Sequence, residues 1–199
     1  NMVTTYNVLI MGASYGSLLA AKLALAGHNT TLVCLPDEAE LINEGGIRVR
    51  MPIRGRDGLV EVASNDVTGN VSAAEPNDVN PSDFDLVALA MQEPQYGASG
   101  VRELLDRVAL SRVPCMSIMN MPPLPYLARI PGLDISKLAD CYTDASVWDN
   151  VTQPFQSSFT TWVWEIPGHG KTAAVGNLTI DSAVELFGKF LEENNIDYP

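Results

Sequence analysis

A short glycine turn near the start of the chain, Gly12-Ala13-Ser14-Tyr15-Gly16, has residue types suited to binding an anion. It follows an apolar run, Val8 to Met11, and leads into small and apolar residues at helical spacing that end at Gly27. A second apolar strand, Thr31 to Cys34, comes next. The amino end of a helix presents unpaired N–H groups and the positive end of the helix dipole, so this turn favours an anion such as a pyrophosphate.

The strand, helix and strand around this turn are predicted to form one βαβ unit, the outline of a dinucleotide site. The turn departs from the usual G-x-G-x-x-G pattern because it holds only two glycines. If Gly12 is the first, serines fill the other two places; if Gly16 is the third, Met11 and Ala13 fill them. The helix pattern favours the second register. A unit whose glycines serve only the turn is the alternative.

Polar residues follow two later apolar runs. Leu86 to Met91 is typical of a strand buried in a parallel sheet, and Gln92 and Gln95 come after it. Pro114 to Met119 is a second such run, followed by Asn120. The carboxyl ends of these strands face the ligand crevice, so Met91, the two glutamines and the asparagine are candidate ligand contacts. Asn120 is also suited to starting the turn into the prolines that follow.

The segment after the second strand is expected to choose between cofactors. A carboxylate there accepts hydrogen bonds from the adenosine ribose of NAD, whereas an arginine pairs with the 2′-phosphate of NADP. The chain has Cys34-Leu35-Pro36 and then Asp37 and Glu38. Asp37 could reach the ribose, but a carboxylate is equally suited to the start of a helix predicted over Glu38 to Asn43, and this interpretation is favoured.

The remaining pattern indicates an α/β, Rossmann-type doubly wound fold with a mostly parallel sheet. Ile47 to Met51 and Leu59 to Ala63 predict a hairpin insert. The hairpin carries four arginines: Arg48, Arg50, Arg54 and Arg56. They are expected to lie on a solvated strand face, and an anion-binding patch is the less favoured alternative. Residues 64–82 are predicted to be a loop with a short strand or helical turn. Phe159 to Ile166 and Thr172 to Val175 predict an antiparallel hairpin at the C-terminal edge, before an amphipathic helix over Asp181 to Glu193.

Composition limits the classes of partner. The 199 residues carry a net charge of −12, with a sequence pI near 4.4, which argues against nucleic acid. No apolar run has the length of a membrane span, and the start lacks the organisation of a signal peptide, so a cytoplasmic protein without membrane contact is expected. Three widely spaced cysteines fit reduced thiols better than disulfides or a metal site.

Most of residues 6–130 resembles the N-terminal domain of the ketopantoate reductase (2-dehydropantoate 2-reductase) family. The matching stretches are Gly16 to Val33, Leu41 to Val49, Leu86 to Gln95 and Met119-Asn120-Met121. Three features depart from the family: Gln92 stands where the family carries a lysine, Leu35 where an arginine is expected, and the glycine turn is altered.

The resemblance implies an oxidoreductase with NADP as cofactor, NAD being the alternative, and a small 2-oxo acid or related ketone as substrate. It implies that residues 2–199 form the NAD(P)-binding domain. In the family a separate helical domain supplies the catalytic lysine and glutamate, so no catalytic residue is assigned in this chain, and the chain alone is predicted inactive. A face that met such a domain would be apolar and would favour homo-oligomers. The alternatives are a non-catalytic nucleotide-binding or sensing module, and an opine-type dehydrogenase domain.

Overall fold

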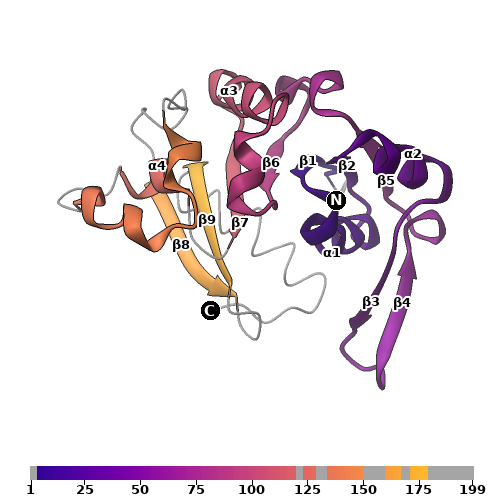
Figure 1. Ribbon diagram of the computed structural model, residues 1–199. Helices are drawn as coiled ribbons and strands as arrows, with labels where there is room; N and C mark the ends of the chain where they lie inside the picture. The colour runs from indigo at the N-terminus through magenta and orange to yellow at the C-terminus, as the bar shows by residue number, and fades with distance from the viewer. Residues whose placement is uncertain (1–3, 120–122, 129–133, 150–159, 167–170, 179–199) are drawn as a thin grey trace.

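A seven-stranded sheet is the main feature of the computed structural model, which describes residues 4–119, 123–128, 134–149, 160–166 and 171–178 (Figure 1). Its strands are β1 (Asn7–Met11), β2 (Asn29–Val33), β5 (Asn70–Ala74), β6 (Leu86–Leu89), β7 (Cys115–Met119), β8 (Thr160–Ile166) and β9 (Lys171–Leu178). They lie in the order β5-β2-β1-β6-β7-β9-β8. The first five are parallel, and β9 is antiparallel to both neighbours. This confirms the predicted fold class, including the antiparallel edge hairpin.

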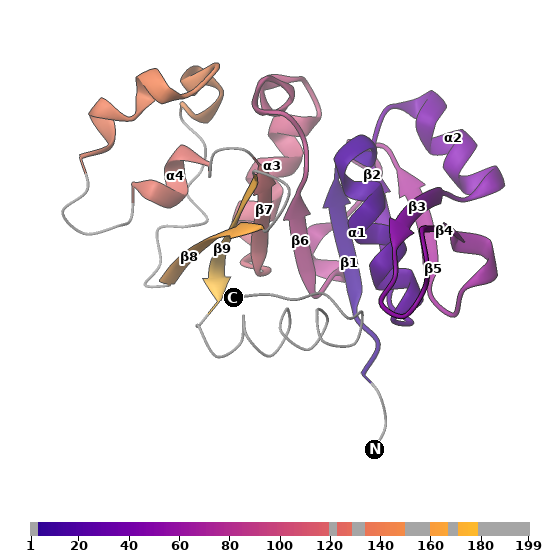
Figure 2. The ribbon, with the colours of Figure 1, turned by 90° about the horizontal axis from the view of Figure 1, so that it is seen from below.

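Four α-helices and a separate hairpin surround the described part of the sheet. The helices are α1 (Ala13–Leu25), α2 (Pro36–Gly45), α3 (Val101–Ser111) and the short α4 (Leu124–Leu127). The hairpin pairs β3 (Arg48–Pro52) with β4 (Leu59–Ala63). The remaining turns are 3₁₀ helices: η1 (Ser64–Asp66), η2 (Pro76–Asp78), η3 (Pro81–Asp83), η4 (Glu93–Gly97), η5 (Ile135–Lys137), η6 (Ala139–Cys141) and η7 (Ala145–Trp148). Figure 2 shows α1 and the hairpin beside the β1, β2 and β5 part of the sheet.

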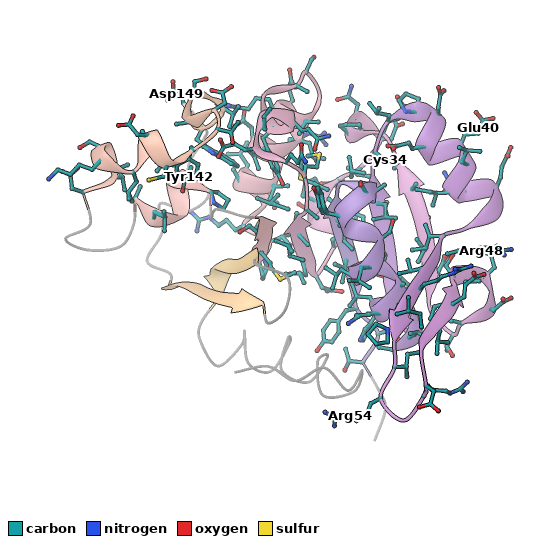
Figure 3. All side chains as sticks on the ribbon, turned by 60° about the horizontal axis from the view of Figure 1, so that its bottom comes forward. Cys34, Glu40, Arg48, Arg54, Tyr142 and Asp149 are labelled. Carbon is teal, nitrogen blue, oxygen red and sulfur yellow. The ribbon has the colours of Figure 1, made fainter. Side chains whose placement is uncertain are left out.

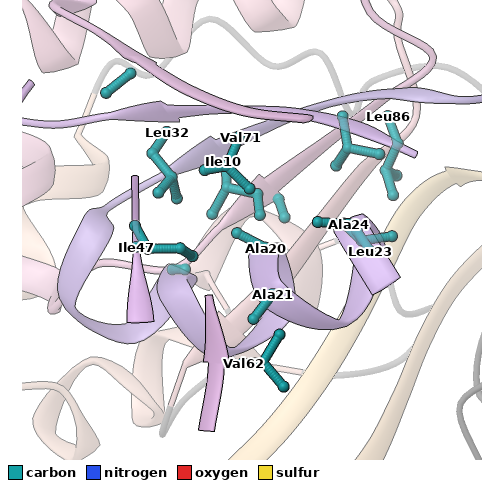
Figure 4. Close-up of a cluster of buried hydrophobic side chains, with 14 of the residues drawn as sticks. Ile10, Ala20, Ala21, Leu23, Ala24, Leu32, Ile47, Val62, Val71 and Leu86 are labelled. Atoms are coloured by element: carbon teal, nitrogen blue, oxygen red, sulfur yellow. The ribbon is translucent and has the colours of Figure 1, made fainter. Parts of the chain in front are cut away.

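Both faces of the sheet are buried at β1, whose alternate residues point to opposite sides and enter two different cores. Val8 and Ile10 of β1 belong to the core that includes α1 and the β3–β4 hairpin (Figure 4). Leu9 and Met11 belong to a second core, with α3 and η7. The continuous apolar run of β1 is therefore the pattern of a central parallel strand, with helices packed on either face.

Close contact between α1 and the sheet depends on Gly16. A Cβ built at this position would lie 2.5 Å from Ile10 Cγ2 and 3.2 Å from Leu32 Cδ2. Larger residues are disfavoured there because the α1 backbone lies directly on the side chains of Ile10 and Leu32. Gly16 therefore performs the packing role of the third glycine in a dinucleotide turn, which supports the second of the two predicted registers.

The β5 edge of the sheet is covered by α2. The side-chain amide of Asn43 donates to the Ala73 carbonyl oxygen at 2.9 Å, and its oxygen accepts from the Ala73 N–H at 2.8 Å. These two bonds occupy backbone groups that an edge strand otherwise offers to another chain. Prediction allowed residues 64–82 only a short strand or turn, whereas the structure forms β5 and three 3₁₀ turns there.

Predicted boundaries of most other elements agree within a few residues. The helix expected over 38–43 extends from Pro36 to Gly45, and β9 is longer than the predicted 172–175. The amphipathic helix expected over 181–193 lies outside the described residues.

We expect Gly16→Ala to destabilise the fold although alanine is the better helix former. Overpacking of this kind costs about 1–3 kcal/mol of unfolding free energy, and urea unfolding followed by circular dichroism measures it. The matched control is Gly45→Ala in α2, where an added Cβ meets nothing within 4 Å. The control should be neutral or gain up to about 1 kcal/mol. Equal effects of the two substitutions would contradict the packing role of Gly16.

Candidate functional site

The candidate site lies where the chain changes direction across the sheet, at the carboxyl ends of β1 and β6. From β1, α1 leads to β2 on one side, while β6 pairs with β1 on the other. Beyond the strand ends, the Gly12 N–H donates to the Val33 carbonyl and the Ala90 N–H to the Met11 carbonyl, both at 2.9 Å. The turn after β1 is thus tied to both neighbouring strands at the position where doubly wound sheets bind their ligands.

Gly12 is required by this geometry. Its φ of 111° lies in the region that side chains rarely adopt. A Cβ there would also lie 2.6 Å from Met91 Cγ and 2.7 Å from the Ala90 carbonyl oxygen. Gly12 therefore allows a tight turn pressed against the end of β6. Its neighbour Ala13 is the first residue of α1 and holds the place of the second glycine in the supported register.

The first turn of α1 is suited to an anion. Gly12 forms the N-cap without a side-chain hydrogen bond, and the first turn contains no acidic residue. Ala13 is half-buried, while Ser14 and Tyr15 are exposed. Backbone N–H groups of a first turn have no partner within the helix, so the turn can receive an oxyanion. The residues present therefore fit a diphosphate at this point.

The end of β6 reaches the same turn. Gln92 Nε2 donates to the hydroxyl oxygen of Tyr15 at 3.1 Å, which joins two predicted site residues that are 77 positions apart. Gln95 has a structural task, because its side-chain oxygen accepts from the Gln92 N–H at 2.9 Å and caps η4. Of the two glutamines, Gln92 is the one whose side chain extends to the glycine turn.

Beneath this surface, Tyr96 holds the end of β6 in place. Its side chain is fully buried, and its hydroxyl oxygen accepts from the Met91 N–H at 3.1 Å. Burial raises the pKa of Tyr96 well above its ordinary value, so the hydroxyl stays protonated. Its ring packs on that of Trp148, with centroids 5.2 Å apart. Sequence reasoning missed both residues, since nothing in the local pattern indicates a contact across 52 positions.

Glu93 connects the site to the segment containing η7. Its carboxylate accepts from the Asp144 N–H at 2.6 Å and from Trp148 Nε1 at 3.3 Å. Arg102 of α3 donates to the carbonyl oxygens of Val147 and Asp149. The segment is therefore fastened to both η4 and α3. None of the predicted site residues lies in this segment.

The end of β2 carries no basic side chain. Leu35 is the N-cap of α2 and is 70% exposed. Glu38 accepts from the Leu35 N–H at 3.4 Å, so the capping carboxylate is Glu38 rather than Asp37, which lies exposed in the first turn. Burial and then the Glu38 charge raise the pKa of the Cys34 thiol to about 11, and the thiol is neutral at pH 7.

The other predicted features lie elsewhere. Arg48 and Arg50 of the hairpin both pair with Glu61 at 3.5 Å, which agrees with a solvated strand face. Asn120 lies outside the described residues.

Within the described part of the chain no group of three or more potential ligands is placed to hold a metal ion. None of the described helices combines the length and the apolar character needed to cross a bilayer.

Comparison with solved structures connects this geometry to known proteins. A putative ketopantoate reductase from Ralstonia solanacearum aligns with 94% of this chain and 59% of its own length, at a TM-score of 0.50 and 17% sequence identity. The chain shares its fold with that ketopantoate reductase structure. The resemblance seen in the sequence is thereby confirmed at the level of fold.

Two further matches are more partial. A probable 2-dehydropantoate 2-reductase from Bacillus subtilis is 23% identical, with a TM-score of 0.36 over 52% of this chain and 29% of that one. A ketopantoate reductase from Ralstonia eutropha is 20% identical, with a TM-score of 0.33 over 56% of this chain and 41% of that one. The chain thus spans less than two thirds of each of the three. No protein-family model and no curated protein matches the sequence.

Replacing each of the two tyrosines by phenylalanine should have different effects on the free energy of unfolding. Tyr96→Phe removes the acceptor of the buried Met91 N–H and should cost about 1–3 kcal/mol of unfolding free energy. Tyr15→Phe removes an exposed hydroxyl and should change it by less than about 0.5 kcal/mol. Urea unfolding of both variants checks this. A Tyr96→Phe protein as stable as the parent would contradict the anchoring role of the Tyr96 hydroxyl.

Proposed function

We propose that this chain is the NAD(P)-binding domain of an oxidoreductase similar to the ketopantoate reductases, which reduces a 2-oxo acid or related ketone. The observation that carries the proposal is the β1–α1 turn. Gly12 and Gly16 bring an uncapped helix terminus to the point where β2 and β6 diverge from β1. That position, in a sheet ordered as in doubly wound nucleotide-binding folds, is suited to the diphosphate of a dinucleotide.

Different segments of the site would contact different parts of the dinucleotide. Backbone N–H groups of Ala13 to Tyr15 would hold the diphosphate. The β2 end, with Leu35, would lie beside the adenosine ribose, and the β6 end, with Met91 and Gln92, beside the nicotinamide half. Gln95 and Asn120 complete the proposed set. The bound dinucleotide supplies the hydride, and the protein positions it. NADP is the cofactor that the resemblance implies.

Residues 2–199 are proposed to form this cofactor domain, without catalytic residues of their own. The groups that polarise and protonate the ketone would then be supplied by another domain of the same protein. The net charge of −12 supports a small-molecule partner rather than nucleic acid.

A second candidate is a non-catalytic nucleotide-binding module with the same fold. Two observations favour it: Ala13 places a Cβ where the second glycine allows close approach, and Gln92, which stands where the ketopantoate reductases carry a lysine, is neutral and donates to the Tyr15 hydroxyl. The two candidates differ in activity. Full-length protein that oxidises NADPH or NADH in the presence of 2-oxo acids supports the reductase, whereas ligand binding without turnover supports the module.

The proposed diphosphate site predicts the effect of one added charge. Ser14→Glu places a carboxylate at an exposed position in the first turn of α1. This charge suits the helix dipole, so thermal stability should be kept or raised. It opposes a bound diphosphate, so the Kd for ADP-ribose, measured by isothermal titration calorimetry, should rise at least tenfold, about 1.4 kcal/mol.

Ser82→Glu is the matched control, because Ser82 is exposed in the first turn of η3, which precedes the amino end of β6. This variant should bind ADP-ribose as the parent does. If both variants bound ADP-ribose with the same Kd, the proposal that the diphosphate lies at the α1 amino terminus would be contradicted.

A further inference from the structure

The charges around the end of β2 bear on which dinucleotide the proposed site accepts, an inference that rests on the proposed function. NADP differs from NAD by a phosphate on the adenosine 2′-oxygen, and a phosphate monoester carries about −1.5 to −2 charges at pH 7. A site that takes NADP needs a cation near that oxygen, most often an arginine. The groups that line the β2 end are therefore decisive.

Side chains at the β2 end are neutral or acidic. Leu35 presents an exposed apolar side chain at the helix N-cap. Asp37 and Glu38 follow in the first turn of α2, both exposed. Glu75 is exposed directly after β5, the strand that pairs with β2. The Cys34 thiol, with its pKa raised to about 11 by burial and by Glu38, adds no charge at pH 7.

Several arginines in the described part of the chain already bind other groups of the protein. Arg48 and Arg50 pair with Glu61 on the hairpin. Arg102 donates to backbone carbonyls of the η7 segment. Arg107 lies nearer, because it donates to the carbonyl of Pro76, the residue after Glu75, but it is held there by this bond and by a second one to the Val79 carbonyl. Figure 3 shows Arg54 at the end of the hairpin that is remote from Cys34.

The hairpin also lies far from the β2 end. The ten residues of α2 lie between Leu35 and the start of β3, and at 1.5 Å per residue they span about 15 Å. An arginine at the start of β3 is therefore too far away to reach a phosphate beside Leu35.

We infer that the site selects NAD(H) over NADP(H), with Asp37 accepting hydrogen bonds from the adenosine ribose hydroxyls and the β2 end repelling a 2′-phosphate. Two carboxylates at the start of α2 disfavour a dianion, and the ion pairs found among the described residues are both made by Glu61, not by these carboxylates. Glu38 is held by the Leu35 N–H, whereas Asp37 lies one residue nearer the strand end. This preference is the reverse of the one that the family resemblance implies.

Binding of four ligands to the full chain tests this inference: NADH, NADPH, ADP-ribose and 2′-phospho-ADP-ribose, each by isothermal titration calorimetry. NADH and ADP-ribose should bind at least tenfold more tightly than their 2′-phosphorylated counterparts. The double variant Leu35→Arg, Asp37→Ser should reduce that ratio at least tenfold by supplying a cation and removing a carboxylate. Thermal unfolding confirms that the variant is folded.

Leu59→Arg is the matched control, because Leu59 is a 66% exposed leucine on the hairpin, against 70% for Leu35. It should leave the ratio unchanged. NADPH binding as tightly as NADH would overturn the inference and leave the proposed function intact, and so would an equal response of the ratio in both arginine variants. Failure of all four ligands to bind would overturn the proposed function and this inference with it.

Discussion

The close packing of the α1 backbone on the sheet is the constraint on which the rest of the site depends. Two glycines make it possible at different points. Gly12 lets the chain turn against Ala90 and Met91, and Gly16 lets the first turn of the helix lie on Ile10 and Leu32. A larger residue at either point would lift the helix from the strands. The orientation of the α1 amino terminus, and so its use as an anion site, follows from packing rather than from any polar side chain.

The two faces of the sheet support the site in different ways. On the α1 face, small side chains such as Ala20 and Ala24 allow the close approach. On the other face, Tyr96 and Trp148 fill the space beneath the end of β6 with large rings, and the Tyr96 hydroxyl fixes the Met91 N–H. Glu93 then ties this corner to a segment some fifty residues further along the chain. The β6 side is therefore held by long-range contacts, whereas the β1 side is held by local geometry.

This division explains what the sequence could predict. The βαβ unit, the buried strands and both hairpins have strong periodic patterns, so they were found within a few residues. The glycine turn was located because its chemistry is local. The Tyr15–Gln92 bond, the Tyr96 anchor and the Glu93 contacts could not be predicted, because each joins side chains whose proximity only the packed fold determines. β5 was indicated weakly, since Asn70 to Ala74 is short, and it is stabilised by pairing with β2 and by Asn43.

The first turns of α1 and α2 contain no basic side chain, which changes how an anion would be held there. Lysine or arginine would attract a diphosphate over several ångströms, with a strength that falls as salt screens the charges. Backbone N–H groups act only at hydrogen-bond distance, so their contribution depends on geometry and varies little with ionic strength. Carboxylates at Asp37, Glu38 and Glu75 add repulsion to the same edge. Recognition here would therefore rest on the shape of the α1 turn, and each further phosphate on the ligand would weaken binding rather than strengthen it.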